Sequence, residues 1–398
     1  MSISVCILAK NEEMHILECL KSVKDIATEI IVINNNSTDN TKEIALDFGC
    51  KVIDSPHTVL DEGRNLYLEA ATSKWIFIID ADERLDDFTR NEIHKSINEA
   101  EKNERILALT LDSYQYIGKG RWATIKLIRM VRNGENIRYQ DTPIHSDLET
   151  SVLENNGEIA HCKAFVHHID ILINNRTKFK RERYKNHIIE MLRNEKITSI
   201  TGGYLTCFLG LEYAAMNQFN VAESLYIQVI NDNKEIRDFA KIFLAQNYIM
   251  QQKFKEAERT ITTLENANNT IDYQITPILT EIHRSKGELD IAINLINNSI
   301  EKEPHLAHNY LNLSILYQDI NPLKSIEAIE DASRINNYVT NPIINKIGES
   351  PNIFHQQTCI IDSKFTTVEI MEKCCRKLDC FERFSHLFSE DRGWINVI

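Results

Sequence analysis

The sequence predicts an α/β domain over residues 1–190 followed by an all-α domain of helical repeats over residues 200–335. Two observations indicate this division. Short apolar strands alternate with helices up to residue 79, and beyond residue 200 the apolar pattern is helical only. A chain of 398 residues is long enough for two or three domains. Residues 336–398 show no repeat, and we assign them to a capping or dimerisation segment.

Four apolar runs predict the strands of the first domain. Helices are predicted between them at residues 14–23, 40–48 and 66–71, the first with Met14, Leu17, Leu20 and Val23 on one face. A β-α-β-α-β-α-β order predicts a parallel sheet covered by helices on both faces. The predicted strands are residues 2–9, 29–33, 51–54 and 75–79.

The fourth run, WIFIID at residues 75–80, ends in a cluster of carboxylates. Asp80, Asp82 and Glu83 follow five apolar residues directly. In open α/β sheets, ligands bind beyond the carboxyl ends of the strands. Three carboxylates so close together repel one another. A cation such as Mg²⁺ or Mn²⁺ relieves this repulsion and can also bind phosphates. The alternative is a solvated acidic turn.

Composition excludes several classes of protein. The net charge of −13, from 45 basic and 58 acidic residues, is unfavourable for bulk binding to nucleic acid. The strand-to-helix turns contain neither a dinucleotide-binding GxGxxG nor a P-loop motif. The nine cysteines include no CxxC pair, and no 18-residue apolar run is present, so we expect a cytoplasmic protein without a transmembrane segment. Cys374, Cys375 and Cys380 could bind metal or pair, although plain thiols are the simpler interpretation.

Further strands are predicted beyond the carboxylates. Residues 105–112 form one. Residues 125–132 and 136–140 are expected to form a hairpin around a type I′ turn at Asn133-Gly134. A last strand over residues 159–168 ends in two adjacent histidines, His167 and His168.

Four segments in this order resemble the family 2 glycosyltransferases with a GT-A fold: ISVCILAKNEE, EIIVINNNSTDNT, GRN at residues 63–65, and KWIFIIDADE. The resemblance covers about residues 1–190. It implies that Asp80 and Asp82 form the DxD pair that holds a divalent cation and the sugar nucleotide. It also implies a set of nucleotide-sugar contacts. These are Ala9, Asn11, Glu12, Asn34, Arg64 and Asp80.

Two departures from the family pattern affect the expected site. Asn34 stands where the family usually has an Asp that contacts the base, which weakens the usual preference for uridine. RMV at residues 129–131 and IHSD at residues 144–147 resemble a motif found in one subset of this glycosyltransferase family. Ser146 of this chain stands where that subset has Glu. We therefore expect Asp147 to be the general base, with Glu149 in reserve.

Three histidines are candidates for the cation site. His145 is predicted as a metal ligand or diphosphate contact, and a structural loop histidine is the alternative. The resemblance also implies that His167 or His168 completes the metal site. An ordinary histidine at a strand end is the alternative for both.

The second domain resembles tetratricopeptide repeats. Ala222, Ala257 and Ala292 recur at intervals of 35 residues, and small residues also recur twelve positions before each of them. Small residues let paired helices approach closely, and stacked pairs bury a face that no single pair can bury. The alternative is a helical bundle without repeats. The earlier positions are Gly210, Ala245 and Thr280.

Together these features predict an inverting, metal-dependent glycosyltransferase. Its donor is a nucleotide-diphosphate sugar, with UDP-sugar the first choice, and its acceptor is a peptide, protein or glycan, including a peptide Cys or Ser. The arrangement resembles the peptide S-glycosyltransferases of bacteriocin clusters. The repeats would position the acceptor or form a homodimer. The alternative, favoured by Asn34 and Ser146, is a catalytically degenerate GT-A scaffold whose repeats bind a protein partner.

Overall fold

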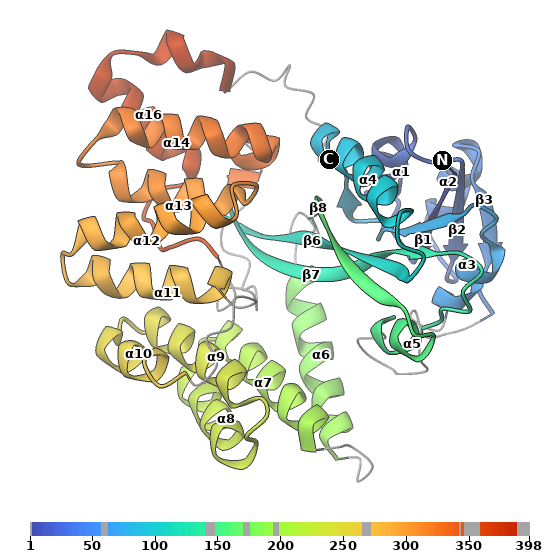
Figure 1. Ribbon diagram of the computed structural model, residues 1–398, viewed down its shortest axis with the longest axis horizontal. Coiled ribbons are helices and arrows are strands. Elements are labelled where there is room, and N and C mark those ends of the chain that lie inside the picture. The colour runs from blue at the N-terminus through green and yellow to red at the C-terminus, as the bar shows by residue number, and fades with distance from the viewer. Residues whose placement is uncertain are drawn as a thin grey trace. The chain divides into compact units, whose positions relative to one another are not determined.

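The computed structural model divides by its internal contacts into two units (Figure 1). The first comprises Met1–Gln115 and Ile125–Asp170, and the second comprises Tyr116–Thr124 and Ile171–Trp394. Helix α6 (Arg176–Leu192) and the tip of the hairpin formed by β6 (Ile106–Gly118) and β7 (Arg121–Arg132) therefore belong to the helical unit. The three-part division at residues 190, 200 and 336 stays a prediction. The described residues are 2–56, 63–118, 120–139, 148–169, 176–193, 199–264, 272–341, 344–345 and 359–387.

The first unit is built on one mixed sheet with the strand order β3-β2-β1-β4-β7-β6-β8-β5. Its first four strands are parallel, as predicted, and β7 joins β4 in antiparallel register, with Phe77 opposite Met130. The carboxyl ends of β1, β2 and β4 therefore lie along one edge of the sheet, which we call the rim. The strands are β1 Ile3–Ala9, β2 Glu29–Asn34, β3 Lys51–Asp54, β4 Trp75–Ile78, β5 Glu83–Arg84, β6 Ile106–Gly118, β7 Arg121–Arg132 and β8 Glu158–His168.

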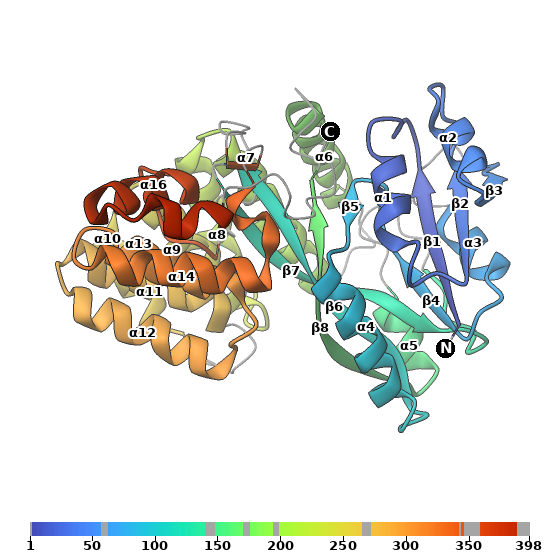
Figure 2. The same ribbon diagram turned by 90° about the horizontal axis from the view of Figure 1, so that it is seen from above.

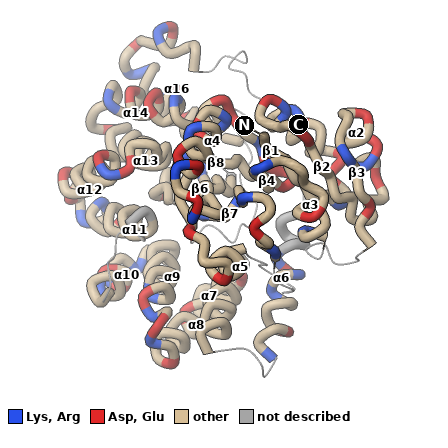
Figure 3. The backbone as a smooth tube through the Cα atoms, turned by 45° about the vertical axis from the view of Figure 1, so that its right-hand side comes forward, with Lys and Arg blue, Asp and Glu red and all other residues tan. Residues whose placement is uncertain are grey.

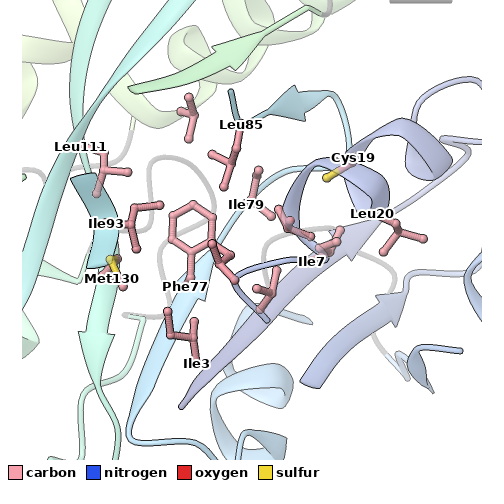
Figure 4. Close-up of a cluster of buried hydrophobic side chains, with 14 of the residues drawn as sticks. Ile3, Ile7, Cys19, Leu20, Phe77, Ile79, Leu85, Ile93, Leu111 and Met130 are labelled. Atoms are coloured by element: carbon pink, nitrogen blue, oxygen red, sulfur yellow. The ribbon is translucent and has the colours of Figure 1, made fainter. Parts of the chain in front are cut away.

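Helices cover both faces of this sheet. On one face α1 (Ile16–Val23), α2 (Thr41–Asp47) and α4 (Asp87–Ala100) enclose a core around Phe77 (Figures 2 and 4). On the other face α3 (Arg64–Ala70) packs on β1 and β2, and α5 (Glu149–Glu154) packs on β8.

The buried face of α1 differs from the predicted one. Met14 and Leu17 are 61% and 39% exposed, whereas Ile16 and Cys19 are fully buried together with the predicted Leu20 and Val23. The helix begins only at Ile16, so its inward stripe contains residues 16, 19, 20 and 23.

The predicted hairpin around Asn133-Gly134 is wrong. Strand β7 ends at Arg132, and residues 136–139 form no strand. The side chain of Asn65 provides the reason, because it accepts from the backbone N–H of Tyr139 and donates to the Tyr139 carbonyl, at 2.9 and 3.1 Å. A side-chain amide thus replaces the strand partner that the hairpin would have supplied.

The second unit is a stack of helices, each packed on the next (Figure 1). Ala222, Ala257 and Ala292 are fully buried, as the repeat interpretation predicts. A Cβ on Gly210 would lie 2.4 Å from the Tyr226 ring, which explains the small residue there. The elements are α6 Arg176–Leu192, α7 Ser199–Ala215, α8 Phe219–Asp232, α9 Arg237–Met250, α10 Phe254–Ile261, α11 Asp272–Ser285, α12 Leu289–Lys302, α13 Ala307–Tyr317, α14 Pro322–Ile335, η3 Asn337–Thr340, α16 Thr367–Leu378 and η5 Phe381–Leu387.

Three general features complete the fold. Acidic and basic positions are interspersed along the chain (Figure 3). All nine cysteines are free thiols, and only Cys380 is not buried. Within the described ranges, no helix combines the length and apolar character needed to span a bilayer.

Candidate active site at the rim of the sheet

The loops after β1 and β2 are hydrogen-bonded to each other at the rim. Asn11 adopts a left-handed conformation, with φ of 57°, and its side-chain oxygen accepts from the backbone N–H of Thr38 at 2.8 Å. Asn is among the residues that tolerate this conformation best. The backbone N–H of Glu12 donates to the Thr41 hydroxyl at 2.7 Å. Two of the predicted nucleotide contacts, Asn11 and Glu12, are thereby fixed against the second loop.

Asn34 and Ala9 lie opposite each other in the β1–β2 register. The Asn34 amide donates to the Asp54 carboxylate at 2.8 Å, and its oxygen accepts from the Ser37 backbone at 3.2 Å. Lys42 forms an ion pair with the same Asp54 carboxylate at 2.7 Å. A carboxylate of the neighbouring strand β3 therefore lies beside Asn34 and is itself paired with Lys42.

A closed turn follows β4 and carries the three carboxylates. The Asp80 backbone N–H donates to the Glu83 carboxylate at 3.0 Å, and the Glu83 N–H donates back to the Asp80 carbonyl at 2.9 Å. The fully buried Arg84 donates to the carbonyls of Ala81 and Glu83 at 2.9 and 2.8 Å. These bonds fix the direction in which Asp80 and Asp82 point.

Two guanidinium groups hold Asp80. Arg129 Nη2 lies 3.1 Å from Asp80 Oδ2, and Arg64 Nη2 lies 3.5 Å from Asp80 Oδ1. Burial raises the pKa of Asp80, but Arg129 and Arg64 outweigh burial and hold that pKa well below its usual range. Arg64 also lies over the Tyr139 ring, 5.5 Å from its centroid. The prediction that Arg64 and Asp80 share the site is consistent with this contact.

Glu83 is the second carboxylate bound to Arg129. It is fully buried, and its Oε1 lies 2.5 Å from Arg129 Nη2. Burial raises the pKa of Glu83 to about 7, with Asp80 adding to the rise and Arg129 opposing it. Sequence reasoning missed the role of Arg129. The available signal was an arginine in the middle of a strand that is otherwise apolar on its inner face, because such a charge is buried only with a partner.

The two histidines at the end of β8 have different partners. His168 Nε2 lies 3.5 Å from Asp82 Oδ2, and the His168 side chain is 15% exposed. His167 is fully buried and lies 3.1 Å from Asp86 Oδ2. Burial raises the pKa of Asp86, but His167 and the hydrogen bonds from Thr89 together outweigh burial and lower that pKa. His167 therefore holds the start of α4, whereas His168 faces the second carboxylate of the DxD pair.

The predicted base and the third histidine cannot be placed. His145 and Asp147 lie outside the described residues. Glu149 is exposed and opens α5.

Comparisons with known proteins match the part of the chain that carries most of these residues. Residues 4–153 match the model of the Glycosyl transferase family 2. This segment is a family 2 glycosyltransferase domain. It contains every described rim residue named above apart from His167 and His168, which follow it in the same sheet.

Relatives match between 20% and 38% of the chain. A TPR repeat-containing protein of Synechococcus elongatus is 32% identical over 152 residues, which is 38% of this chain and 36% of that protein. An uncharacterised glycosyltransferase of Rickettsia typhi is 35% identical, over 34% of this chain and 41% of its own length. The Bacillus subtilis glycosyltransferase SunS is 43% identical over 84 residues, 20% of each chain. The chain thus spans well under half the length of these relatives.

Solved structures give weaker likenesses. S. aureus TarS aligns with a TM-score of 0.35 at 14% identity, over 68% of this chain and 56% of that one. A Mycobacterium tuberculosis glucosyl-3-phosphoglycerate synthase in complex with Mn²⁺ and UDP-glucose aligns with a TM-score of 0.25 at 22% identity. The alignment covers 28% of this chain and 43% of that one.

Proposed function

We propose that the chain transfers a sugar from a nucleotide-diphosphate donor to an acceptor hydroxyl or thiol at the rim of the sheet. The observation that carries the proposal is the charge arrangement there. Asp80 lies in the segment that matches the family 2 glycosyltransferase model and is bound by two arginines. It adjoins a pair formed by Asp82 of the same segment and His168, which follows that segment in the sheet. A diphosphate leaving group develops negative charge, and fixed positive groups stabilise that charge.

Asp82 and His168 are the residues that would hold a divalent cation. Their ligand atoms are 3.5 Å apart, close to the roughly 3 Å expected between two neighbouring ligands of one ion. Oxygen and imidazole nitrogen together suit Mn²⁺, and Mg²⁺ is the alternative. When bound, the cation supplies a Lewis acid for the diphosphate oxygens. Asp80 is already neutralised by Arg64 and Arg129, so we assign it to orientation of the donor rather than to the cation.

The remaining chain residues have separate tasks. Arg64, at the start of α3, provides a positive group that is partly exposed and so available to a phosphate. Asn34, with Asp54 behind it, is the proposed contact to the base, and a uridine donor fits because an amide oxygen can accept from its ring N–H. Ala9, Asn11 and Glu12 complete the proposed nucleotide site. Asp147 stays the predicted base, with Glu149 in reserve.

The acceptor is the part of the proposal that rests on the second unit. A stack of helical repeats offers an extended surface suited to a peptide or protein. We therefore propose a peptide or protein acceptor, with Cys or Ser as the accepting residue, and a glycan as the alternative. A Cys thiol needs less help from a base than an alcohol does, because its pKa is several units lower.

Hydrolysis of the donor tests the proposal without knowledge of the acceptor. The wild type is incubated with Mn²⁺ and a panel of nucleotide sugars, beside Asp82→Asn and the exposed control Asp25→Asn. We expect Asp82→Asn to lose about 100-fold or more of the activity while Asp25→Asn retains it. Binding of Mn²⁺ measured by calorimetry should weaken in His168→Asn and not in His94→Asn. Equally slow hydrolysis by the wild type and Asp82→Asn would favour the degenerate scaffold.

A further inference from the structure

The end of helix α16 brings two cysteines together. Asp379 adopts the left-handed conformation, with φ of 49°, directly after the last helical residue, Leu378. The Cys375 carbonyl accepts from the backbone N–H groups of both Asp379 and Cys380, the latter at 3.2 Å. Helix ends of the Schellman type have this bond from the second residue past the helix, and they pack its side chain on the last turn. The turn therefore sets Cys380 against Cys375.

The two thiols interact directly but differ in exposure. Burial raises the pKa of the Cys375 thiol to about 12, and the adjacent Cys380 thiol adds to the rise. Cys375 is fully buried, whereas Cys380 is the single cysteine of the chain that is partly exposed. The pair thus combines one thiol that a reagent in solvent can reach with one that it can reach only through the first.

The neighbouring Cys374 faces another part of the unit. It is fully buried, and its Sγ donates to the Gln318 carbonyl at 3.8 Å. Within the described part of the chain, Cys375 and Cys380 belong to no group of three or more ligand atoms that lie within 4.8 Å of one another. A structural zinc site needs four such ligands. Of the two reactions open to these cysteines from the sequence, the geometry therefore favours pairing over metal binding.

A bond between the two sulfur atoms would join two elements of the second unit. Cys375 lies in the last turn of α16, and Cys380 directly precedes η5, which is anchored by buried Phe384 and Leu387. In the reduced chain the junction depends on the left-handed Asp379, a conformation that costs free energy for any residue other than glycine. A disulfide here closes only a short loop, so its effect falls on this junction rather than on the whole unit.

We propose that Cys375 and Cys380 form a reversible disulfide, which links the end of α16 to η5 when the chain meets a small-molecule disulfide. Disulfides that form in reducing compartments are usually transient or redox-sensing, and a partly exposed thiol beside a buried one suits that use. The nine free thiols of the structure represent the reduced form. The proposal concerns the second unit alone and does not depend on sugar transfer.

Two exchange steps form the bond. The Cys380 thiolate attacks one sulfur of the small disulfide, whose S–S bond breaks and releases one thiolate. Cys375 then gives up its proton, and its thiolate attacks Cys380 Sγ and displaces the second small thiolate. The two protons lost by the cysteines pass to the two released thiolates, and the small disulfide has been reduced by two electrons. Because the pKa of Cys375 is raised, the second step should be the slower one.

Oxidised glutathione tests the pair in the folded, full-length chain. The reduced protein is incubated with it without denaturant, quenched in acid and mapped by mass spectrometry. In the wild type we expect a bond between Cys375 and Cys380, preceded by a short-lived glutathione adduct on Cys380. Cys375→Ala cannot complete the second step, so its final adduct on Cys380 should exceed that of the wild type by about 10-fold or more. The matched control Cys374→Ala should form the bond as the wild type does.

Limited proteolysis reads the effect of the bond on the fold. Trypsin cleavage after Arg383, an exposed residue of η5, should slow by about threefold or more in the oxidised wild type and recover after reduction with dithiothreitol. Circular dichroism establishes that each variant is folded. A permanent adduct on Cys380 of the wild type, bonds between separate chains, or no reaction at all would overturn the proposal and leave two packed thiols. Donor hydrolysis is scored separately, so failure here leaves the proposed function standing.

Discussion

The two units bury polar side chains in different ways. At the rim of the sheet, buried charges pair with one another, as Arg129 does with Glu83 and Asp80. In the helical unit, buried amides mostly bind the main chain, as Asn312 and Asn233 do. Neutral groups would hold a turn at lower cost, so the buried charges at the rim fit the proposed donor site rather than a purely structural turn. The difference also predicts that substitutions at the rim leave unpaired charges and have the larger effects.

The largest effect is expected from Arg129→Met. Loss of this guanidinium leaves Glu83 buried without its ionic partner, so we expect the free energy of unfolding to fall by about 3–5 kcal/mol. Urea denaturation measures it. The control is Arg105→Met, which removes an exposed pair with Glu158 and should cost about 1 kcal/mol or less. Equal losses in the two variants would contradict the comparison.

The double variant Arg129→Met/Glu83→Gln shows whether the loss of stability comes from the unpaired Glu83 carboxylate or from lost packing. With both charges removed, part of the lost stability should return, because no buried carboxylate is left unpaired. Additive losses in the double variant would show that Arg129 acts through packing.

The strength of each prediction from the sequence depended on how local its signal was. The apolar run before Asp80 ends abruptly, and the 35-residue spacing of Ala222 and Ala257 is continuous along the chain, so both strand and repeats were predictable. The Asp80–Arg129 contact joins residues 49 positions apart, through a strand pairing that no local pattern specifies. The contact between Asn65 and Tyr139 also joins distant residues, 74 positions apart, and no local pattern indicates it. Because Asn65 takes the place of a strand partner, the predicted hairpin does not form.

Glu212 is a buried charge in the helical unit, where most buried polar side chains are neutral. It pairs with the buried Arg181 at 3.5 Å, as the charges at the rim pair with one another. Burial raises the pKa of Glu212 to about 7, against the opposing charge of Arg181. The folded state therefore binds the proton more tightly, and this contribution to stability is lost as pH rises from about 4.5 to about 7. Between pH 5 and 8 we expect the wild type to lose up to about 3 kcal/mol relative to Glu212→Gln.

Thermal or urea unfolding at several pH values measures this slope. Glu99→Gln, at an exposed position, should keep the wild-type slope. A wild type whose stability ran parallel to that of Glu212→Gln would mean that Glu212 is already solvated.

A smaller effect is expected from Gly210→Ala, which tests packing without any polar group. The added Cβ would meet the Tyr226 ring at 2.4 Å, so the helices must separate or the ring must move. We expect a loss of about 1–3 kcal/mol in urea denaturation. Ser224→Ala on the exposed face of α8 should be neutral or slightly stabilising. A stable Gly210→Ala would show that α7 and α8 can adjust.

The smallest effect is expected at His308 of α13, which is 1% exposed. Among the described residues, neither of its ring nitrogens has a hydrogen-bond partner. Burial, with a contribution from His305, lowers the pKa of His308 to about 3. The imidazole is therefore neutral in the folded state, and its unsatisfied nitrogens cost free energy that a leucine of similar volume would not.

We expect His308→Leu to raise the free energy of unfolding by about 1 kcal/mol at pH 7. The unfolded state takes up a proton below pH 6.5 and the folded state resists it, so the wild type should lose stability as pH falls from about 6.5 towards 3. The advantage of His308→Leu should therefore grow in acid, whereas that of Glu212→Gln grows in base. Unfolding at pH 5 and pH 8 distinguishes the two directions, with His187→Leu as a control at a less buried histidine. An acid slope shared by the wild type and His308→Leu would show that a ligand or water satisfies the ring.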